Sequence, residues 1–143
     1  MKIFTIGYEG ATQAELIAAL HAAGVEVLAD IRAVPLSRRP GFSKNILAAG
    51  LGEAGIGYVG LKPLGTPAEG REAARKGQHA RLAQIYAAQL DLPEAIVAGA
   101  QLRELASERP TALLCFERDP SCCHRSLLVE ALFAGAERVD LFA

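Results

Sequence analysis

Residues 3–34 read IFTIGYEGATQAELIAALHAAGVEVLADIRAV, and this stretch decides the fold class. Its first run of apolar, β-branched residues ends at Gly7 and predicts a short strand. Thr12 and Glu15 have the spacing of a capping box, so we expect a helix to begin there. The nearly unbroken apolar run over 25–34 predicts a second strand, buried on both faces in its first half. A strand, a helix and another strand in this order indicate a parallel pair joined by a crossover.

The same alternation continues to the end of the chain, although residues 66–79 show no clear period. The other segments are predicted as strands over 56–61, 111–116 and 138–142, and as helices over 43–54, 78–90, 93–108 and 122–133. We therefore expect a single three-layer α/β/α domain over 1–143, Rossmann-like, with a mainly parallel sheet of about five strands. No internal repeat or linker divides it.

The composition suits one domain with its own core. The chain has 143 residues, 51% of them apolar, and a formal net charge of −1. The apolar fraction excludes a disordered chain, and the near-neutral charge argues against wholesale coating of nucleic acid while allowing a local basic patch. No apolar run is long enough to span a membrane or to act as a signal peptide, so no membrane partner is expected. An odd count of three cysteines suits a reducing compartment, and we predict a cytoplasmic protein.

Polar side chains follow each of the first four predicted strands. In an open parallel sheet, ligands bind beyond the carboxyl ends of the strands, which all lie at one edge. We therefore expect a binding or catalytic pocket at this edge. The side chains predicted to lie there are Tyr8 after the first strand, Arg32, Ser37, Arg38 and Lys44 after the second, Gly65 after the third, and Glu117, Cys123, His124 and Arg125 after the fourth.

The segment LLCFERDPSCCHRS at 113–126 carries the most chemistry. It places Cys123, His124 and Arg125 in the first turn of a helix, where free N–H groups and the helix dipole favour an anion and lower the pKa of a thiol. One interpretation is a phosphate site built from His124 and Arg125. A second is a catalytic thiol, with Cys123 as nucleophile and His124 or Glu117 beside it. In a purely structural interpretation, Glu117 and Arg125 form an ion pair across the turn.

A further interpretation of the same segment is a metal site formed by Cys115, Cys122 or Cys123, and His124. Adjacent Cys-Cys-His residues do not match the paired ligand spacing of structural zinc sites, so we assign no metal ligands from the sequence. In the structural interpretation Cys115 is a small buried core residue and Cys122 has no role.

The loop over residues 32–44 contains no acidic residue and four basic ones, Arg32, Arg38, Arg39 and Lys44. Such a loop suits the phosphates of a nucleotide or of nucleic acid. Asp30 shares a strand face with Arg32, so it would hold a sugar hydroxyl, act as a base or pair with an arginine. Phe42 either stacks on a base or anchors the loop to the core.

Two other segments are less specific. The turn GYEG at 7–10 lacks the full glycine spacing of a dinucleotide-binding fingerprint, so Gly7 either lets a ligand approach the backbone or only permits the turn. The span 71–81 is also basic and would close over the same edge as a lid, although a solvated helix face is the simpler interpretation.

Six short motifs are spread over nearly the whole chain. They are TIGYEG at 5–10, D-x-R at 30–32 leading to P-x-S-R at 35–38, PGFSK at 40–44, AGI-x-Y at 54–58, LG at 64–65 and LCFE-x-DP-x-x-CHRS at 114–126. Together they resemble the bacterial and archaeal family named domain of unknown function 488. The resemblance implies a fold and a set of site residues but no established reaction. These residues are Gly7, Tyr8, Asp30, Arg32, Ser37, Arg38, Phe42, Ser43, Lys44, Gly65, Cys115, Glu117, Cys123, His124 and Arg125.

The leading functional hypothesis is an enzyme that processes a nucleotide or nucleic acid in a pocket for a phosphorylated or otherwise anionic ligand. Glu117 or His124 would act as acid or base, and Cys123 is the candidate nucleophile. The anion would be held by Arg32, Arg38 and Arg125.

Two rival hypotheses use the same residues differently. One is a non-catalytic module that binds nucleic acid through 32–44 and 71–81, and the other is a thiol-based redox sensor centred on Cys123. The enzyme needs its basic groups in one concave pocket, so guanidinium groups on separate surfaces would contradict it. The sequence identifies neither a cofactor nor an oligomeric state.

Overall fold

The computed structural model describes residues 1–143 with the exception of the side chain of Cys122. Its centre is a five-stranded parallel sheet in the order β3-β2-β4-β1-β5. The strands are β1 (Lys2–Gly7), β2 (Val27–Asp30), β3 (Gly57–Gly60), β4 (Thr111–Cys115) and β5 (Glu137–Phe142). The α-helices are α1 (Gln13–Ala22), α2 (Lys44–Glu53), α3 (Ala68–Arg75), α4 (His79–Leu90), α5 (Pro93–Glu108) and α6 (His124–Leu132), with short 3-10 helices η1 (Lys62–Leu64) and η2 (Pro120–Cys122). None of the described helices has the combination of length and apolarity that a bilayer crossing requires.

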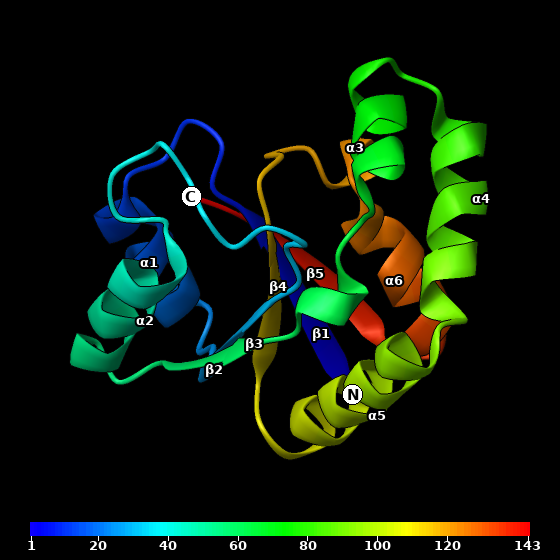
Figure 1. The fold of residues 1–143 in the computed structure, drawn as a ribbon. Coiled ribbons are helices and arrows are strands. Elements are labelled where there is room, and N and C mark those ends of the chain that lie inside the picture. The colour runs from blue at the N-terminus through cyan, green and yellow to red at the C-terminus, as the bar shows by residue number, and fades with distance from the viewer.

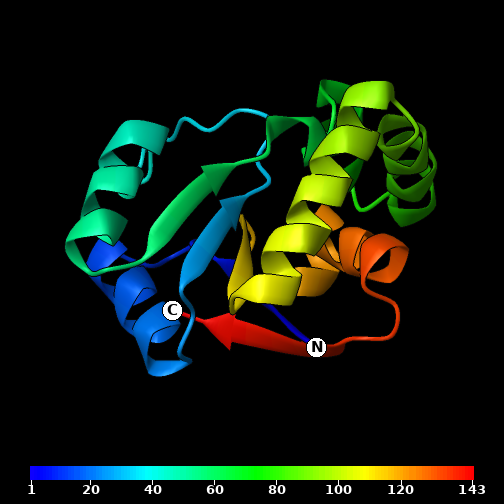
Figure 2. The same ribbon diagram turned by 90° about the horizontal axis from the view of Figure 1, so that it is seen from below.

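Helices cover both faces of the sheet (Figures 1 and 2). Because side chains alternate along a strand, neighbouring residues of β1 enter opposite cores. Phe4 packs with α1 and α2 on one face, among Leu16, Leu20, Leu47 and Leu51. Ile3 packs with α4, α5 and α6 on the other, among Tyr86, Leu102, Leu128 and Phe133. The predicted three-layer α/β/α architecture with a parallel sheet is confirmed.

The ends of β1 and β4 mark the point where the chain connections diverge. Gly7, the last residue of β1, lies opposite Cys115, the last residue of β4. Beyond Gly7 the chain crosses to α1 on one face, whereas beyond Cys115 it crosses to α6 on the other (Figure 1). In open α/β sheets such a divergence leaves a crevice where ligands bind. The topology therefore directs attention to the loops that follow these two strands.

The ends of the elements follow from local hydrogen bonds. The predicted capping box of α1 is present, because Thr12 Oγ1 accepts the Glu15 N–H at 3.1 Å and the Glu15 carboxylate accepts the Thr12 N–H at 2.9 Å. Strand β2 is shorter than predicted because the Asp30 carboxylate accepts the backbone N–H of Arg32 at 3.1 Å, and the chain leaves the sheet there.

Helix α3 lies within residues 66–79, for which the sequence predicts no element bounds, although a helix face is the favoured interpretation of the basic span that begins at Arg71. Its residues that face inward are Gly70 and Ala73, so its buried side carries almost no apolar side chain. A side chain at Gly70 would run into Thr66, Leu82 and Ile85, which shows how closely α3 approaches α4. The helix depends on this close packing rather than on the burial of large apolar side chains.

Candidate functional site

A cavity of about 350 Å³ opens at the carboxyl ends of the strands. Six of the site residues named from the sequence line it: Tyr8, Arg32, Cys115, Glu117, Cys123 and His124. The remaining lining residues are Ala33, Val34, Thr66, Arg71, Ala74, Arg75, Leu82 and Phe116. The predicted position of a pocket at this edge thus agrees with where the cavity lies.

Two thiols and an imidazole meet at one wall of the cavity. Cys115 ends β4, Cys123 is the N-cap of α6 and His124 is the first residue of that helix. The two Sγ atoms and a ring nitrogen of His124 all lie within 4.8 Å of one another. All three side chains are buried, and both cysteines are free thiols. The fold therefore brings Cys115 at the end of β4 together with Cys123 and His124 at the start of α6, although Cys115 and Cys123 are eight positions apart in the sequence.

The orientation of the His124 ring is set by the backbone of Ile31, the residue that follows β2. Its Nε2 lies 3.0 Å from the carbonyl oxygen of Ile31, which only accepts, so Nε2 carries the hydrogen. The ring also packs edge-on against Tyr86, with centroids 5.1 Å apart. Burial lowers the pKa of His124, so the ring is neutral and Nδ1 keeps its lone pair. Nδ1 lies 3.8 Å from the Sγ of Cys115.

Cys123 accepts two hydrogen bonds from one residue. The backbone N–H and Nε of Arg125 lie 3.4 and 3.1 Å from its Sγ. The sequence predicts a lowered pKa for this thiol, but burial, followed by the neighbouring Cys115, raises the pKa of Cys123. That prediction is wrong because desolvation outweighs the attraction of Arg125 and of the helix terminus.

Arg125 is fully buried and does not line the cavity. One terminal nitrogen donates to the backbone carbonyl of Glu117 at 2.5 Å, while Nη1 has no hydrogen-bond partner in the described structure. The Glu117 carboxylate lies instead beside Cys115, whose thiol donates to Oε2 at 3.1 Å. The predicted ion pair between Glu117 and Arg125 is therefore wrong, and Arg125 supports Cys123 and the 117–118 backbone.

Asp30 and Arg32 form a buried ion pair, which is one of the predicted alternatives. Nε and Nη2 of Arg32 donate to the two carboxylate oxygens at 2.8 and 2.7 Å, and Nη1 donates to the Phe42 carbonyl at 2.8 Å. Tyr58 donates its hydroxyl hydrogen to the same carboxylate at 2.5 Å. Although Arg32 lines the cavity, Asp30 balances its charge and its donors point into the protein.

The predicted ligand-binding residues of the β2–α2 loop and of the start of α2 lie outside the cavity: Ser37, Arg38, Phe42 and Lys44. Phe42 is buried and stacks on Tyr8 with ring centroids 4.5 Å apart, so it anchors the loop rather than offering a platform for a base. Ser37 and Ser43 close a turn, since the Ser37 N–H donates to Ser43 Oγ at 3.1 Å. Arg38 and Lys44 are exposed to solvent.

The three arginines predicted to hold the anion do not come together in one pocket. Of the three, Arg32 lines the cavity, Arg125 is buried away from it and Arg38 is exposed on the loop. These three arginines therefore do not form one anion-binding group. The physical reason is that buried guanidinium groups are used by nearby acceptors before any ligand binds, which charge counting along the sequence does not reveal.

Gly7 and Gly65 have a steric role at the rim. A Cβ atom at Gly7 would collide with the carbonyl of Glu117, and one at Gly65 would collide with the backbone of Ala33. Neither glycine lines the cavity. Each allows two backbone segments to come together where a side chain would separate them.

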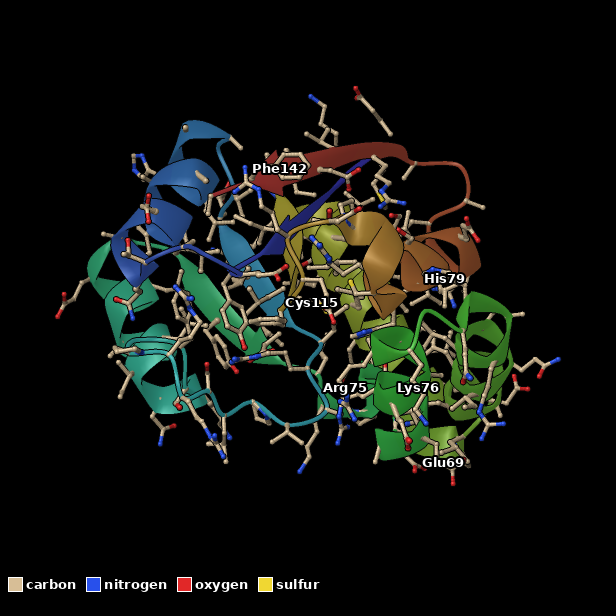
Figure 3. All side chains as sticks on the ribbon, turned by 90° about the horizontal axis from the view of Figure 1, so that it is seen from above. Glu69, Arg75, Lys76, His79, Cys115 and Phe142 are labelled. Atoms are coloured by element: carbon tan, nitrogen blue, oxygen red, sulfur yellow. The ribbon has the colours of Figure 1, made fainter. Side chains whose placement is uncertain are left out.

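Helix α3 supplies two cations that line the cavity in addition to Arg32, namely Arg71 and Arg75. Arg71 Nη1 donates to the Thr66 carbonyl at 2.8 Å, and Arg75 is exposed. In Figure 3, Arg75 lies on the side of α3 nearer Cys115, whereas Lys76 and His79 lie farther out. The last two belong to a separate hollow between α3 and α4. The basic span 71–81 is the sequence signal that points to these arginines.

Residues 12–132, most of the chain, match the profile of one protein family, described as Domain of unknown function DUF488. The chain belongs to this family. The DUF488 region extends from the N-cap of α1 to the last residue of α6, so it contains every cavity-lining residue except Tyr8. The resemblance seen in the sequence is thereby confirmed. No curated protein and no solved structure matched the chain.

Proposed function

We propose that the cavity binds a small molecule with an anionic group and an apolar or aromatic part, a nucleotide being the leading example, and that the protein is an enzyme acting on it. The observation that carries this proposal is the presence of Arg71 and Arg75 in one cavity with Cys115 and Glu117. A ligand held by the two arginines would reach the group of reactive side chains at the other wall.

The anion-binding part of the proposal rests on the charges around the cavity. Three arginines and one glutamate line it, and Asp30 already compensates Arg32. Arg71 and Arg75 therefore face a single carboxylate, that of Glu117. They are four residues apart on one helix, so both guanidinium groups lie on the same side of α3. The planar fork of a guanidinium fits a phosphate or carboxylate with two parallel hydrogen bonds.

The size and apolar lining favour a ligand larger than a free anion. The cavity volume of about 350 Å³ lies within the range of roughly 300–1,000 Å³ that is common for small-molecule sites. Val34, Leu82 and Phe116 contribute apolar surface next to the arginines. The base of a nucleotide, or another flat ring, would cover this apolar surface while the phosphate of the same molecule reached α3.

Among the predicted catalytic residues, Glu117 is the best placed to exchange a proton with a ligand. Its carboxylate lies at the cavity, only partly buried. His124 uses Nε2 for the Ile31 carbonyl, and Cys123 directs its Sγ toward Arg125. A cytoplasmic location belongs to the same proposal, since the free thiols of Cys115 and Cys123 suit a reducing compartment.

Nucleic acid is the second candidate ligand, because Arg38 on the β2–α2 loop and Lys44 at the start of α2 are exposed outside the cavity. Binding of a strand across this loop would depend on Arg38 and Lys44, whereas binding of a nucleotide in the cavity would not. The two candidates therefore differ in which basic side chains they need.

The test is a thermal-shift screen of the purified protein against mononucleotides, phosphoesters and a short oligonucleotide, because a ligand that binds only the folded state raises the melting temperature. The paired change Arg71→Ala and Arg75→Ala should weaken binding of a hit at least about tenfold, equivalent to about 1.4 kcal/mol. The matched control is Arg81→Ala, a change on α4 outside the cavity, which should leave affinity unchanged. A panel without any shift, or equal binding by all three proteins, contradicts the proposal.

A further inference from the structure

Three donor atoms converge at one wall of the cavity that Arg71 and Arg75 also line, and the proposed binding of an anion by these arginines does not require that arrangement. We propose that the Sγ atoms of Cys115 and Cys123 and the Nδ1 atom of His124 bind one divalent transition-metal ion, with zinc as the expected metal, and that its remaining coordination position opens to the cavity. Soft thiolate ligands together with imidazole are the donor set that zinc prefers. The inference stands whether or not the cavity binds an anion.

The distances between the donors are close to those of a tetrahedral site. Zn–S bonds of about 2.3 Å and Zn–N bonds of about 2.0–2.1 Å place a sulfur and a nitrogen ligand roughly 3.6 Å apart, and two sulfur ligands roughly 3.8 Å apart. Cys115 Sγ and His124 Nδ1 lie 3.8 Å apart, and all three donors lie within 4.8 Å of one another. Small side-chain rotations therefore complete the site without movement of β4 or α6.

The hydrogen bond of His124 prepares its other nitrogen as a ligand. Because Nε2 donates to the Ile31 carbonyl, the lone pair of Nδ1 is directed to the side of the ring where Cys115 lies. Histidines that bind metals usually donate their second N–H to a carbonyl or carboxylate in this way, which fixes the ring and its tautomer. This observation is independent of the cysteines.

Arg125 provides a second independent support, because it donates to a sulfur atom from a fully buried position. Its Nε lies 3.1 Å from Cys123 Sγ, and the described structure gives it no carboxylate partner. A neutral thiol is a weak acceptor, whereas a metal-bound thiolate is a good one. Binding of a dication with loss of one proton from each of the two thiols leaves the total charge of the cluster unchanged, so no uncompensated charge is buried.

Three protein ligands next to a cavity are typical of a catalytic rather than a structural zinc site, because structural sites use four. The Glu117 carboxylate, 3.1 Å from Cys115 Sγ, is placed to bind the ion directly or to accept a hydrogen bond from a water molecule on it. The spacing of the cysteines and the histidine along the sequence does not reveal these three ligands, because Cys115 reaches the other two only through the contact between β4 and α6.

The first test measures metal binding by the unmodified chain under reducing conditions. The protein is treated with a chelator, loaded with Zn²⁺ or Co²⁺, and assayed for metal content and for its absorption spectrum. We expect one metal per chain, and for cobalt a thiolate-to-metal charge-transfer band together with the intense visible bands of tetrahedral coordination. Failure to retain either metal on desalting, or a cobalt spectrum without the charge-transfer band, overturns the proposal.

The second test identifies the ligands. Cys115→Ser, Cys123→Ser and His124→Ala should each weaken zinc binding by more than the roughly 10–100-fold that loss of an outer hydrogen-bond partner costs. Cys122→Ser, a change at the remaining cysteine, is the matched control and should keep one metal per chain. Circular dichroism separates loss of the metal from loss of the fold. Loss of the metal in Cys122→Ser, or its retention in all three ligand variants, refutes this ligand set.

The proposed metal site and the proposed anion-binding function can be refuted independently of each other. Nucleotide binding is measured with zinc-loaded and metal-free protein and with the paired Arg71→Ala and Arg75→Ala variant. Intact zinc binding without any anion binding refutes only the proposed function. Anion binding that depends on Arg71 and Arg75 without any zinc binding refutes only the metal site.

Discussion

The Asp30–Arg32 pair and the Cys115–Cys123–His124 cluster lie at the same edge of the sheet, but they use their hydrogen-bonding groups differently. Around Asp30, both carboxylate oxygens are occupied, and every side-chain nitrogen of Arg32 has an acceptor. Around the thiols, His124 Nδ1 faces a sulfur at 3.8 Å, and the Nη1 of Arg125 has no partner in the described structure.

The difference separates a structural network from a candidate site. A buried polar network whose members are all satisfied holds the chain in place and has nothing left for a ligand. A buried cluster with an available lone pair and an unpaired donor is uncommon in folded proteins, and calls for an explanation such as a ligand. Variants that remove single contacts test whether these two regions differ in this way.

Asp30→Ala should lower the free energy of unfolding by about 3–5 kcal/mol, because it leaves the buried Arg32 guanidinium without a counter-charge. Urea denaturation followed by circular dichroism measures the change. The double variant Asp30→Leu and Arg32→Met removes both charges and should recover most of the loss. If the single variant is as stable as the unmodified protein, the pair is not structural.

Tyr58→Phe should cost about 1.5–3 kcal/mol of stability, the range for a hydrogen bond to a charged acceptor, because Tyr58 donates to the Asp30 carboxylate. The same denaturation experiment applies. In the Asp30→Ala background the Tyr58→Phe change should have little further effect, since the acceptor is already gone. Additive losses would show that Tyr58 acts through another contact.

Arg125→Met should weaken zinc binding by roughly 10–100-fold, since it removes the N–H donor to the Cys123 sulfur. Competition with a chromogenic chelator measures the affinity. The exposed Arg118 gives the matched control, and Arg118→Met should leave the affinity unchanged. An equal effect of both variants would mean that general charge, rather than the hydrogen bond, influences the ion.

Arg38→Ala should change stability by less than about 0.5 kcal/mol, because its side chain is exposed on the β2–α2 loop. It should also leave mononucleotide binding in the cavity unchanged. A loss of oligonucleotide binding alone would instead favour the nucleic-acid candidate. This is the smallest expected effect, and it marks the outer limit of the site.

The fold was predictable wherever short-range signals were strong. Thr12 and Glu15 locate the start of α1 because a capping box involves only neighbouring residues. Helix α3 was not assigned from the sequence, since its buried residues are Gly70 and Ala73, which are too small to mark a core-facing side. Its stability comes from packing against α4, and packing partners are not visible in a local window.

The site was predictable in position but only partly in its chemistry. The rule that ligands bind at the carboxyl ends of parallel strands located Glu117, Cys123 and His124 correctly at the cavity. It could not show that Arg32 pairs with Asp30 or that Arg125 is buried against Cys123. Which acceptor a guanidinium reaches depends on side-chain geometry across elements, whereas a sequence reports only that the charge is present.

The backbone contacts at Gly7 and Gly65 have a consequence for how such a protein can diverge. Main-chain atoms set the spacing of the rim at both positions, so changes of side chain elsewhere leave that spacing intact. The opposite wall is one short helix whose Arg71, Ala74 and Arg75 side chains face the cavity. Exchange of these α3 residues alters charge and shape while the thiols and the imidazole keep their places. A few substitutions in α3 can therefore change the character of the cavity without disturbing the thiols and the imidazole of the wall across from it.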